Sequence, residues 1–235
     1  MDFFKRHEKK YLLTPDQYDA VKTAIKPHMA ADSHGTYLVQ NIYFDTDNWD
    51  VIRKSIEKPI YKEKMRLRCY GLPETATELF LELKKKYKGV VYKRRISFSI
   101  KEIDNRNFDE IAKNSGCQVG NELAFYLHCH NVYPRAYISY RREAFFNQQF
   151  RLTFDTNAVF RSKSLNYTNP SEGKIIFPND KILMEIKTPS SIPLWLTGVL
   201  SAEKIYPHSF SKYGAGYTKH IIGGNGKWTS SQAAL

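Results

Sequence analysis

The stretch ELFLELKKKYKGVVYKRRISF, residues 78–98, contains the pattern that decides the fold. Apolar and polar residues alternate on both sides of Lys88-Gly89, as they do in a β-hairpin with a tight turn. Successive side chains of a strand point to opposite faces, so one face of this hairpin is largely apolar. The other face carries Glu82, Lys84, Lys86, Lys93 and Arg95. The sequence therefore predicts a half-buried antiparallel sheet with a densely cationic polar face.

Other predicted strands repeat this division into an apolar and a charged face. The charged positions concerned are Glu8, Lys10, Arg66, Arg68, Arg142, Arg151, Glu185 and Lys187. One interpretation is an ordinary face in contact with water, although such a face usually mixes both signs of charge. The other is a binding face, because like charges on paired strands repel unless a bound anion stabilises them. If the sheet closes into a barrel, the charged faces line a water-filled tunnel that suits a chain of phosphates.

The overall composition is that of a globular protein with an anionic partner. The chain has 235 residues, 42% of them hydrophobic, and a formal net charge of +12. This balance points to nucleic acid, an anionic membrane surface or phosphates, and does not choose among them. Three cysteines without CxxC spacing and no apolar run of about 20 residues predict reduced thiols and a cytoplasmic location without a transmembrane segment. We expect a single domain over residues 1–222 and a flexible tail over residues 223–235.

Strands outnumber helices in the predicted order of elements. Thr14-Pro15-Asp16-Gln17 has the residues of a helix N-terminus, with Thr14 as N-cap and Gln17 completing a capping box. Further helices are predicted at 49–56, 108–114, 121–129, 195–204 and 212–222. Strands are predicted at 37–44, 63–70, 78–87, 90–99, 135–145, 150–154 and 182–187. Antiparallel strands with helices around them indicate an α+β fold built on a large sheet or barrel.

Nine short motifs occur in a fixed order between about residue 4 and about residue 217: RHEKKY, NIYFDT, MRLRCYG, LELKKK, YKRR, YRREAF, RLTFDT, MEIK and FSKY. Together they resemble the VTC domain, the polyphosphate polymerase domain of the triphosphate tunnel metalloenzyme superfamily. The resemblance implies an eight-stranded antiparallel β-barrel tunnel with helices packed outside. It also implies transfer of the ATP γ-phosphate to a growing inorganic polyphosphate chain, with Mn²⁺ or Mg²⁺ as cofactor.

The resemblance also implies roles for individual residues. Catalytic contacts to phosphate are expected from Lys10, Arg66, Arg68, Lys84, Lys93, Arg95, Arg142 and Lys212. Further phosphate contacts are expected from Lys86, Arg151, Lys187 and Ser211. Glu185 in MEIK resembles the metal-binding glutamate, whereas Glu8 and Glu82 are either secondary metal ligands or partners that orient lysine and arginine side chains. Arg6 stands where many tunnel enzymes have the first glutamate of ExExK, which disfavours a hydrolase-type metal site on the first strand.

Other functions remain open at this point. The same fold could hydrolyse tripolyphosphate or nucleoside triphosphates, or bind polyphosphate without turnover. Binding to nucleic acid is disfavoured because the cations alternate onto an inward face and no nucleic-acid-binding motif is present. No transmembrane segment is predicted, and association with a membrane partner stays open. Outside the charged face, we expect structural roles for Asp45, for Asp47 and for His128-Cys129-His130. On the charged face, Asp155 could orient a cation or ligate metal.

Overall fold

The computed structural model describes residues 7–74, 78–88, 90–105, 107–148, 150–189 and 191–223. The predicted flexible tail, from residue 224 on, lies outside the described residues, as do Arg6 and Gly89. None of the described helices is long and apolar enough to cross a lipid bilayer.

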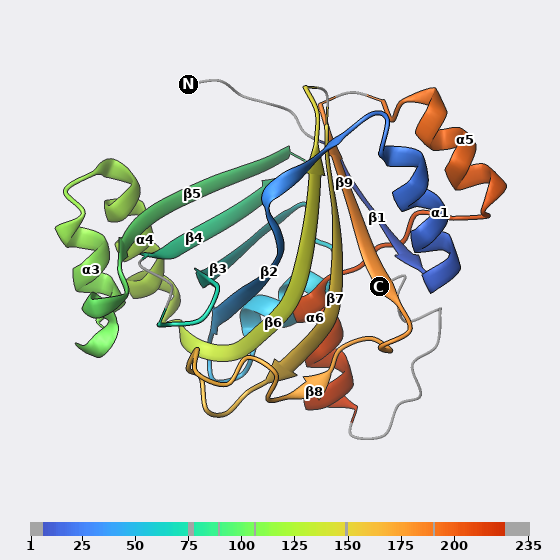
Figure 1. Ribbon diagram of the computed structural model, residues 1–235. Coiled ribbons are helices and arrows are strands. Elements are labelled where there is room, and N and C mark those ends of the chain that lie inside the picture. The colour runs from blue at the N-terminus through green and yellow to red at the C-terminus, as the bar shows by residue number, and fades with distance from the viewer. Residues whose placement is uncertain are drawn as a thin grey trace.

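One antiparallel sheet forms the body of the described chain (Figure 1). Its strands are β1 (His7–Leu13), β2 (Ala30–Asp45), β3 (Tyr61–Tyr70), β4 (Glu78–Tyr87), β5 (Val90–Ser99), β6 (Tyr133–Phe146), β7 (Arg151–Arg161), β8 (Lys174–Ile175) and β9 (Ile182–Thr188). The spatial order is β1-β9-β7-β6-β2-β3-β4-β5, and the short β8 pairs with β7. The predicted hairpin is confirmed, with Leu81 opposite Ile96 and Lys84 opposite Lys93. Strand β8 and the early start of β2 were not predicted.

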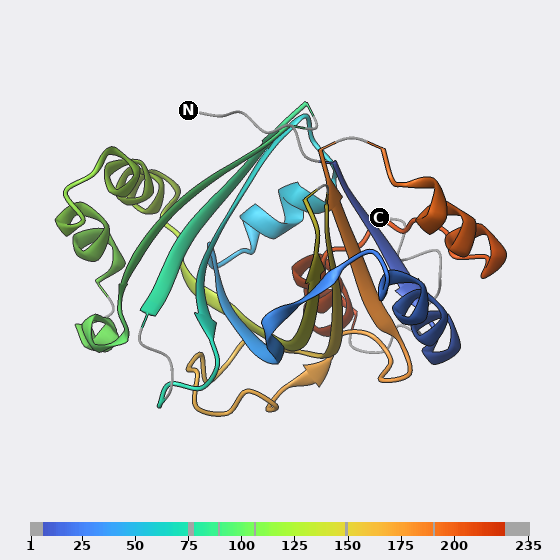
Figure 2. The same ribbon diagram turned by 45° about the horizontal axis from the view of Figure 1, so that its top comes forward.

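The sheet curves around a shared interior but does not close into the expected barrel. No ladder joins its two edge strands, β1 and β5, within the described residues. Figure 2 shows these edges approaching each other at one end and spreading apart at the other. Side chains bridge part of the gap, since the Lys84 ammonium lies 3.7 Å from the Glu8 carboxylate on β1. The expectation was only partly correct because a closed barrel and an open, curved sheet share the same alternation of apolar and charged residues.

The helices cover both surfaces of the sheet. Helices α1 (Pro15–Ile25) and α5 (Leu194–Ala202) lie outside one edge, and α3 (Phe108–Asn114) and α4 (Gln118–His130) lie outside the other (Figure 1). Helices α2 (Asp50–Ile56) and α6 (Lys212–Tyr217) instead pack on the concave surface at one end (Figure 2). Tyr213 of α6 and Ile52 of α2 are buried there against inward residues such as Ile138 and Leu183. The expectation that all helices pack outside was therefore wrong for α2 and α6, which fill one end of the interior.

Local hydrogen bonds explain where two of these helices begin. The capping box of α1 is confirmed, because Thr14 Oγ1 accepts from the Gln17 amide at 3.3 Å and Gln17 Oε1 accepts from the Thr14 amide at 3.0 Å. The carboxylate of Asp45 accepts hydrogen bonds from the amides of Val51 and Ile52 at the start of α2. It also accepts a hydrogen bond of 2.7 Å from the hydroxyl of Tyr213. The structural role predicted for Asp45 is confirmed, and this residue fixes α2 and α6 to each other.

Candidate functional site: a cationic cavity on the concave face

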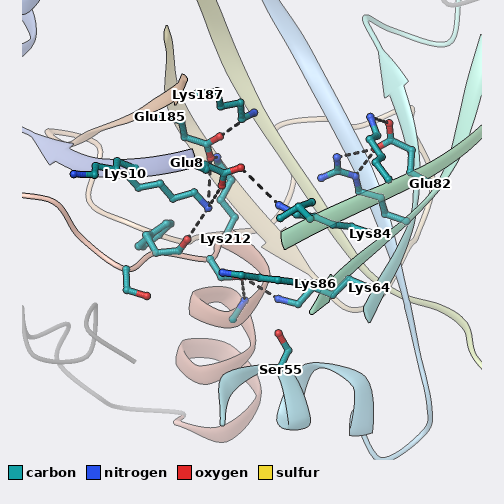
Figure 3. Close-up of a pocket in the computed structure, with 18 of the residues that line it drawn as sticks. Glu8, Lys10, Ser55, Lys64, Glu82, Lys84, Lys86, Glu185, Lys187 and Lys212 are labelled. Atoms are coloured by element: carbon teal, nitrogen blue, oxygen red, sulfur yellow. Dashed lines mark hydrogen bonds and ion pairs between the residues drawn. The ribbon is translucent and has the colours of Figure 1, made fainter. Parts of the chain in front are cut away.

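A cavity of about 1590 Å³ occupies the concave face beside α2 and α6. Every residue proposed above for the site lines it: Glu8, Lys10, Arg66, Arg68, Glu82, Lys84, Lys86, Lys93, Arg95, Arg142, Arg151, Glu185, Lys187, Ser211 and Lys212. They come from seven strands and from the start of α6. Figure 3 shows many of these side chains extending into the same space. The structure therefore brings together the charged positions that the alternation pattern placed on one face.

Cross-strand pairing places the cations of β3, β4 and β5 in rows. Lys64 on β3 is paired with Lys84 on β4, and Lys84 is paired with Lys93 on β5. In the next row, Glu82 stands between Arg66 and Arg95. Because like charges directly opposite each other destabilise a sheet, the row of three lysines needs anions to offset its repulsion.

Glu82 is the counter-ion of the arginine row. Its carboxylate accepts a hydrogen bond of 2.8 Å from Arg66 Nε and lies 2.7 Å from Arg66 Nη2. It also contacts Lys93 closely and lies 4.0 Å from Arg68 and from Arg95. Burial alone would raise the pKa of Glu82, but the charges of Arg66, Arg68 and Lys93 lower it to about 2. Glu82 is therefore ionised at neutral pH and orients the cations around it.

A second ionic cluster surrounds Lys10 on the opposite wall. The Lys10 ammonium lies 3.0 Å from Glu8 and 3.8 Å from Glu185, and it donates a hydrogen bond of 2.9 Å to the backbone carbonyl of Phe210. Glu185 also contacts Lys187 at 3.4 Å and Lys212 at 3.7 Å. Burial opposes ionisation of Glu185, but these lysines hold its pKa well below the usual range. Lys10 and Lys84 similarly outweigh burial and lower the pKa of Glu8 to about 2.

A fourth carboxylate, Asp155, is completely buried behind the cavity wall. It accepts two hydrogen bonds from Arg142, at 2.6 and 2.8 Å, and makes a close contact with the ammonium of Lys212. Burial would raise the pKa of Asp155, but the charges of Arg142 and Lys212 lower it. Of the two roles left open for Asp155, the contacts favour orienting cations.

The comparison with protein families agrees with this geometry. A family model described as the VTC domain matches residues 5–221. The chain belongs to the VTC domain family. No curated protein sequence matches the chain.

Solved structures of other proteins resemble this VTC domain in fold. A crystal structure of a candidate adenylate cyclase from Bacillus halodurans matches with a TM-score of 0.51 and 15% identity, covering 86% of this chain and 93% of that one. A candidate adenylate cyclase from Vibrio parahaemolyticus matches with a TM-score of 0.43 and 13% identity, covering 86% of each chain. At its low identity, the Bacillus match shows a shared fold only.

Two carboxylates of this VTC domain, Glu8 and Glu185, lie beside Lys10 in the cavity. Among the described residues, no three His, Cys, Asp or Glu side chains form a group that could hold a metal ion. His128, Cys129 and His130 are therefore not part of such a group. Mg²⁺ is commonly held by one or two carboxylates together with substrate phosphates, and the pair beside Lys10 fits that arrangement. Glu82 contacts Arg66 and Lys93 in the arginine row and is not part of the Glu8–Glu185 pair.

Lys64 lines the cavity of the VTC domain but was not among the predicted site residues. Its ammonium donates a hydrogen bond of 3.3 Å to Ser211 Oγ and lies 5.9 Å from the ring centre of Tyr213. Burial, followed by the charges of Lys62, Lys10 and Lys84, lowers the pKa of Lys64 to about 7, against a small opposing effect of Asp45. The signal was present in the sequence, because Lys64 alternates in register with Arg66 and Arg68.

We expect Lys64→Met to raise the free energy of unfolding of the ligand-free protein at pH 7 by about 1–3 kcal/mol, because Lys64 is a partly buried charge to which none of the described carboxylates is paired. The unfolded chain binds the Lys64 proton up to pH 10.5 and the folded chain only up to about pH 7, so this lysine makes stability rise with pH between those values. Urea unfolding from pH 7 to pH 9 at constant ionic strength measures both effects. The exposed Lys26→Met serves as control, and an unchanged pH slope in Lys64→Met would contradict the assignment.

Proposed function

We propose that this VTC domain transfers the γ-phosphate of ATP to the end of an inorganic polyphosphate chain and that it requires a divalent cation. The observation that carries the proposal is the convergence of lysines and arginines from distant strands on one cavity, next to the Glu8 and Glu185 carboxylates. Arginine makes bidentate contacts to phosphate and lysine supplies a point charge, so the two together suit a flexible chain of phosphates.

The proposed roles follow from where each group lies. Arg66, Arg68, Lys84, Lys93 and Arg95 bind phosphates from one wall, and Lys10, Arg142 and Lys212 bind them from the other. Lys86, Arg151, Lys187 and Ser211, which also line the cavity, add further phosphate contacts. Glu8 and Glu185 hold the Mg²⁺ or Mn²⁺ ion, which neutralises charge on the phosphates when bound. Glu82 and Asp155 keep the cations in position.

The reaction needs little covalent help from the protein. An oxygen of the terminal phosphate of the acceptor attacks the γ-phosphorus, the bond from that phosphorus to the bridging oxygen breaks, and ADP leaves. The attacking oxygen is already anionic, so no general base is required, and positioning with charge neutralisation supplies the catalysis.

Incubation of the purified protein with ATP and Mn²⁺ or Mg²⁺ tests the proposal. We expect ADP and a polymer that is resolved on a gel and removed by an exopolyphosphatase, and we expect neither product when a chelator removes the metal. Release of inorganic phosphate from ATP or tripolyphosphate without polymer would indicate a hydrolase instead. Tight binding of tripolyphosphate without turnover in any metal would indicate a polyphosphate-binding module, and either result would contradict polymerase activity.

A further inference from the structure

A second, smaller cavity adjoins the main one where β3 begins and β4 ends. Its volume is about 370 Å³, and it is lined by Lys58, Pro59, Ile60, Lys62, Lys86, Lys88 and Ser209. Lys58, Lys62, Lys86 and Ser209 also line the main cavity, so the two spaces share a wall. An anionic chain that fills the main cavity therefore has a neighbouring space into which it can continue.

The charges of this second cavity are all of one sign. Four of its lining residues are lysines, and no carboxylate is among the described residues that line it. Lys62 is directly opposite Lys86 in the β3–β4 ladder, an arrangement of like charges that destabilises the sheet. Burial, together with the charges of Lys86 and Lys58, lowers the pKa of Lys62. The Lys62 ammonium donates a hydrogen bond of 3.2 Å to the backbone carbonyl of Ser55, which fixes its position at the shared wall.

We propose that the lysine-lined cavity of Lys58, Lys62, Lys86 and Lys88 is a second anion site, which binds the phosphates of an inorganic polyphosphate chain beyond those held in the main cavity. The proposal rests on the proposed function, because it requires a phosphate chain in the main cavity. Phosphates bound in this cavity stabilise the protein by neutralising the Lys62–Lys86 pair. Their contacts make the affinity for polyphosphate depend on the length of the chain. Single-stranded nucleic acid fits less well because the described lining residues include no aromatic ring on which a base could stack.

The test compares two ligands on one variant and one matched control. The variant K58Q/K62Q/K88Q removes three lysines of the second cavity, and the control K26Q/K101Q/K163Q removes three exposed lysines that line neither cavity. Affinities for tripolyphosphate and for a size-fractionated polyphosphate several times longer are measured by calorimetry. For K58Q/K62Q/K88Q we expect about a tenfold loss of affinity for the long chain, since three charge contacts comparable with surface ion pairs are removed. Affinity for tripolyphosphate should stay within about twofold of wild type.

The outcomes separate this proposal from the function on which it rests. A wild-type protein that binds neither ligand overturns both. A wild-type protein that binds both, with a variant that loses affinity equally for the two ligands or for neither, overturns the second site and leaves the main cavity as a phosphate site. An equal loss in the control triple variant shows an effect of net charge and also overturns it. Competition by a single-stranded RNA as effective as that by the long polyphosphate shows that the lysines bind nucleic acid, which contradicts the assignment.

Discussion

Replacing Asp155 with alanine is expected to lower the free energy of unfolding by about 3–5 kcal/mol, because removing one partner of a buried ion pair leaves an uncompensated charge. Asp155 is completely buried, and it is the counter-ion for both Arg142 and Lys212. Without it, two cations that are themselves nearly buried face each other across the space of the lost carboxylate. Denaturant unfolding of the ligand-free protein measures the change.

A matched surface pair distinguishes this effect from the loss of any salt bridge. Glu122 bonds Arg94 at 3.0 Å on the outer face of the sheet, where both side chains remain partly exposed. We expect Glu122→Ala to cost less than about 1 kcal/mol. Tripolyphosphate should restore part of the stability lost in Asp155→Ala, since its oxygens can take over as counter-ions for Arg142 and Lys212. A loss in Asp155→Ala no larger than that in Glu122→Ala would show that the buried carboxylate is not required.

The alternation of residues was enough to predict the charged face, but not the shape that contains it. A strand has a period of two, so Lys84, Lys93 and Arg66 had to share one side of the sheet whatever its curvature. Closure depends on pairing between the first and last strands of the sheet, which are far apart in the sequence and carry no local signal of their register. The interior position of α2 and α6 was missed for a similar reason. In the sequence, Tyr213 and Ile52 look like ordinary core residues. Only the structure shows that they pack against the concave surface of the sheet.

The candidate site shows the same limit at the level of single side chains. Motifs identified which charges to expect, but Glu8 and Glu82 could have been metal ligands or orienting partners. Distances favour a different role for each, because Glu8 lies with Glu185 around Lys10, whereas Glu82 lies between Arg66 and Lys93. Such pairing depends on contacts between strands that are adjacent only in the fold. Lys64 was not predicted because the motif MRLRCYG begins at Met65, although Lys64 alternates with Arg66 and Arg68 and so lies on the same face of the strand.

Replacing Glu185 with glutamine should change catalysis and binding in opposite directions. The substitution keeps the size of the side chain and removes the negative charge that would hold the metal. We expect metal-dependent transfer from ATP to fall by about a hundredfold or more, comparable with the loss of one group that stabilises the transition state. Affinity for tripolyphosphate in the presence of a chelator should instead rise, because one anion has been removed from among Lys10, Lys187 and Lys212.

The opposite signs matter because a purely structural role for Glu185 predicts something else. If Glu185 only held Lys10 and Lys212 in place, its loss would let both lysines move, and binding and transfer would decline together. Glu143→Gln is the control, since Glu143 bonds Lys22 at 2.7 Å and does not line the cavity. Calorimetry with tripolyphosphate and transfer rates over a range of Mn²⁺ concentrations measure the two effects separately. Full transfer by Glu185→Gln at ordinary metal concentrations would remove Glu185 from the metal site, whatever happens to binding.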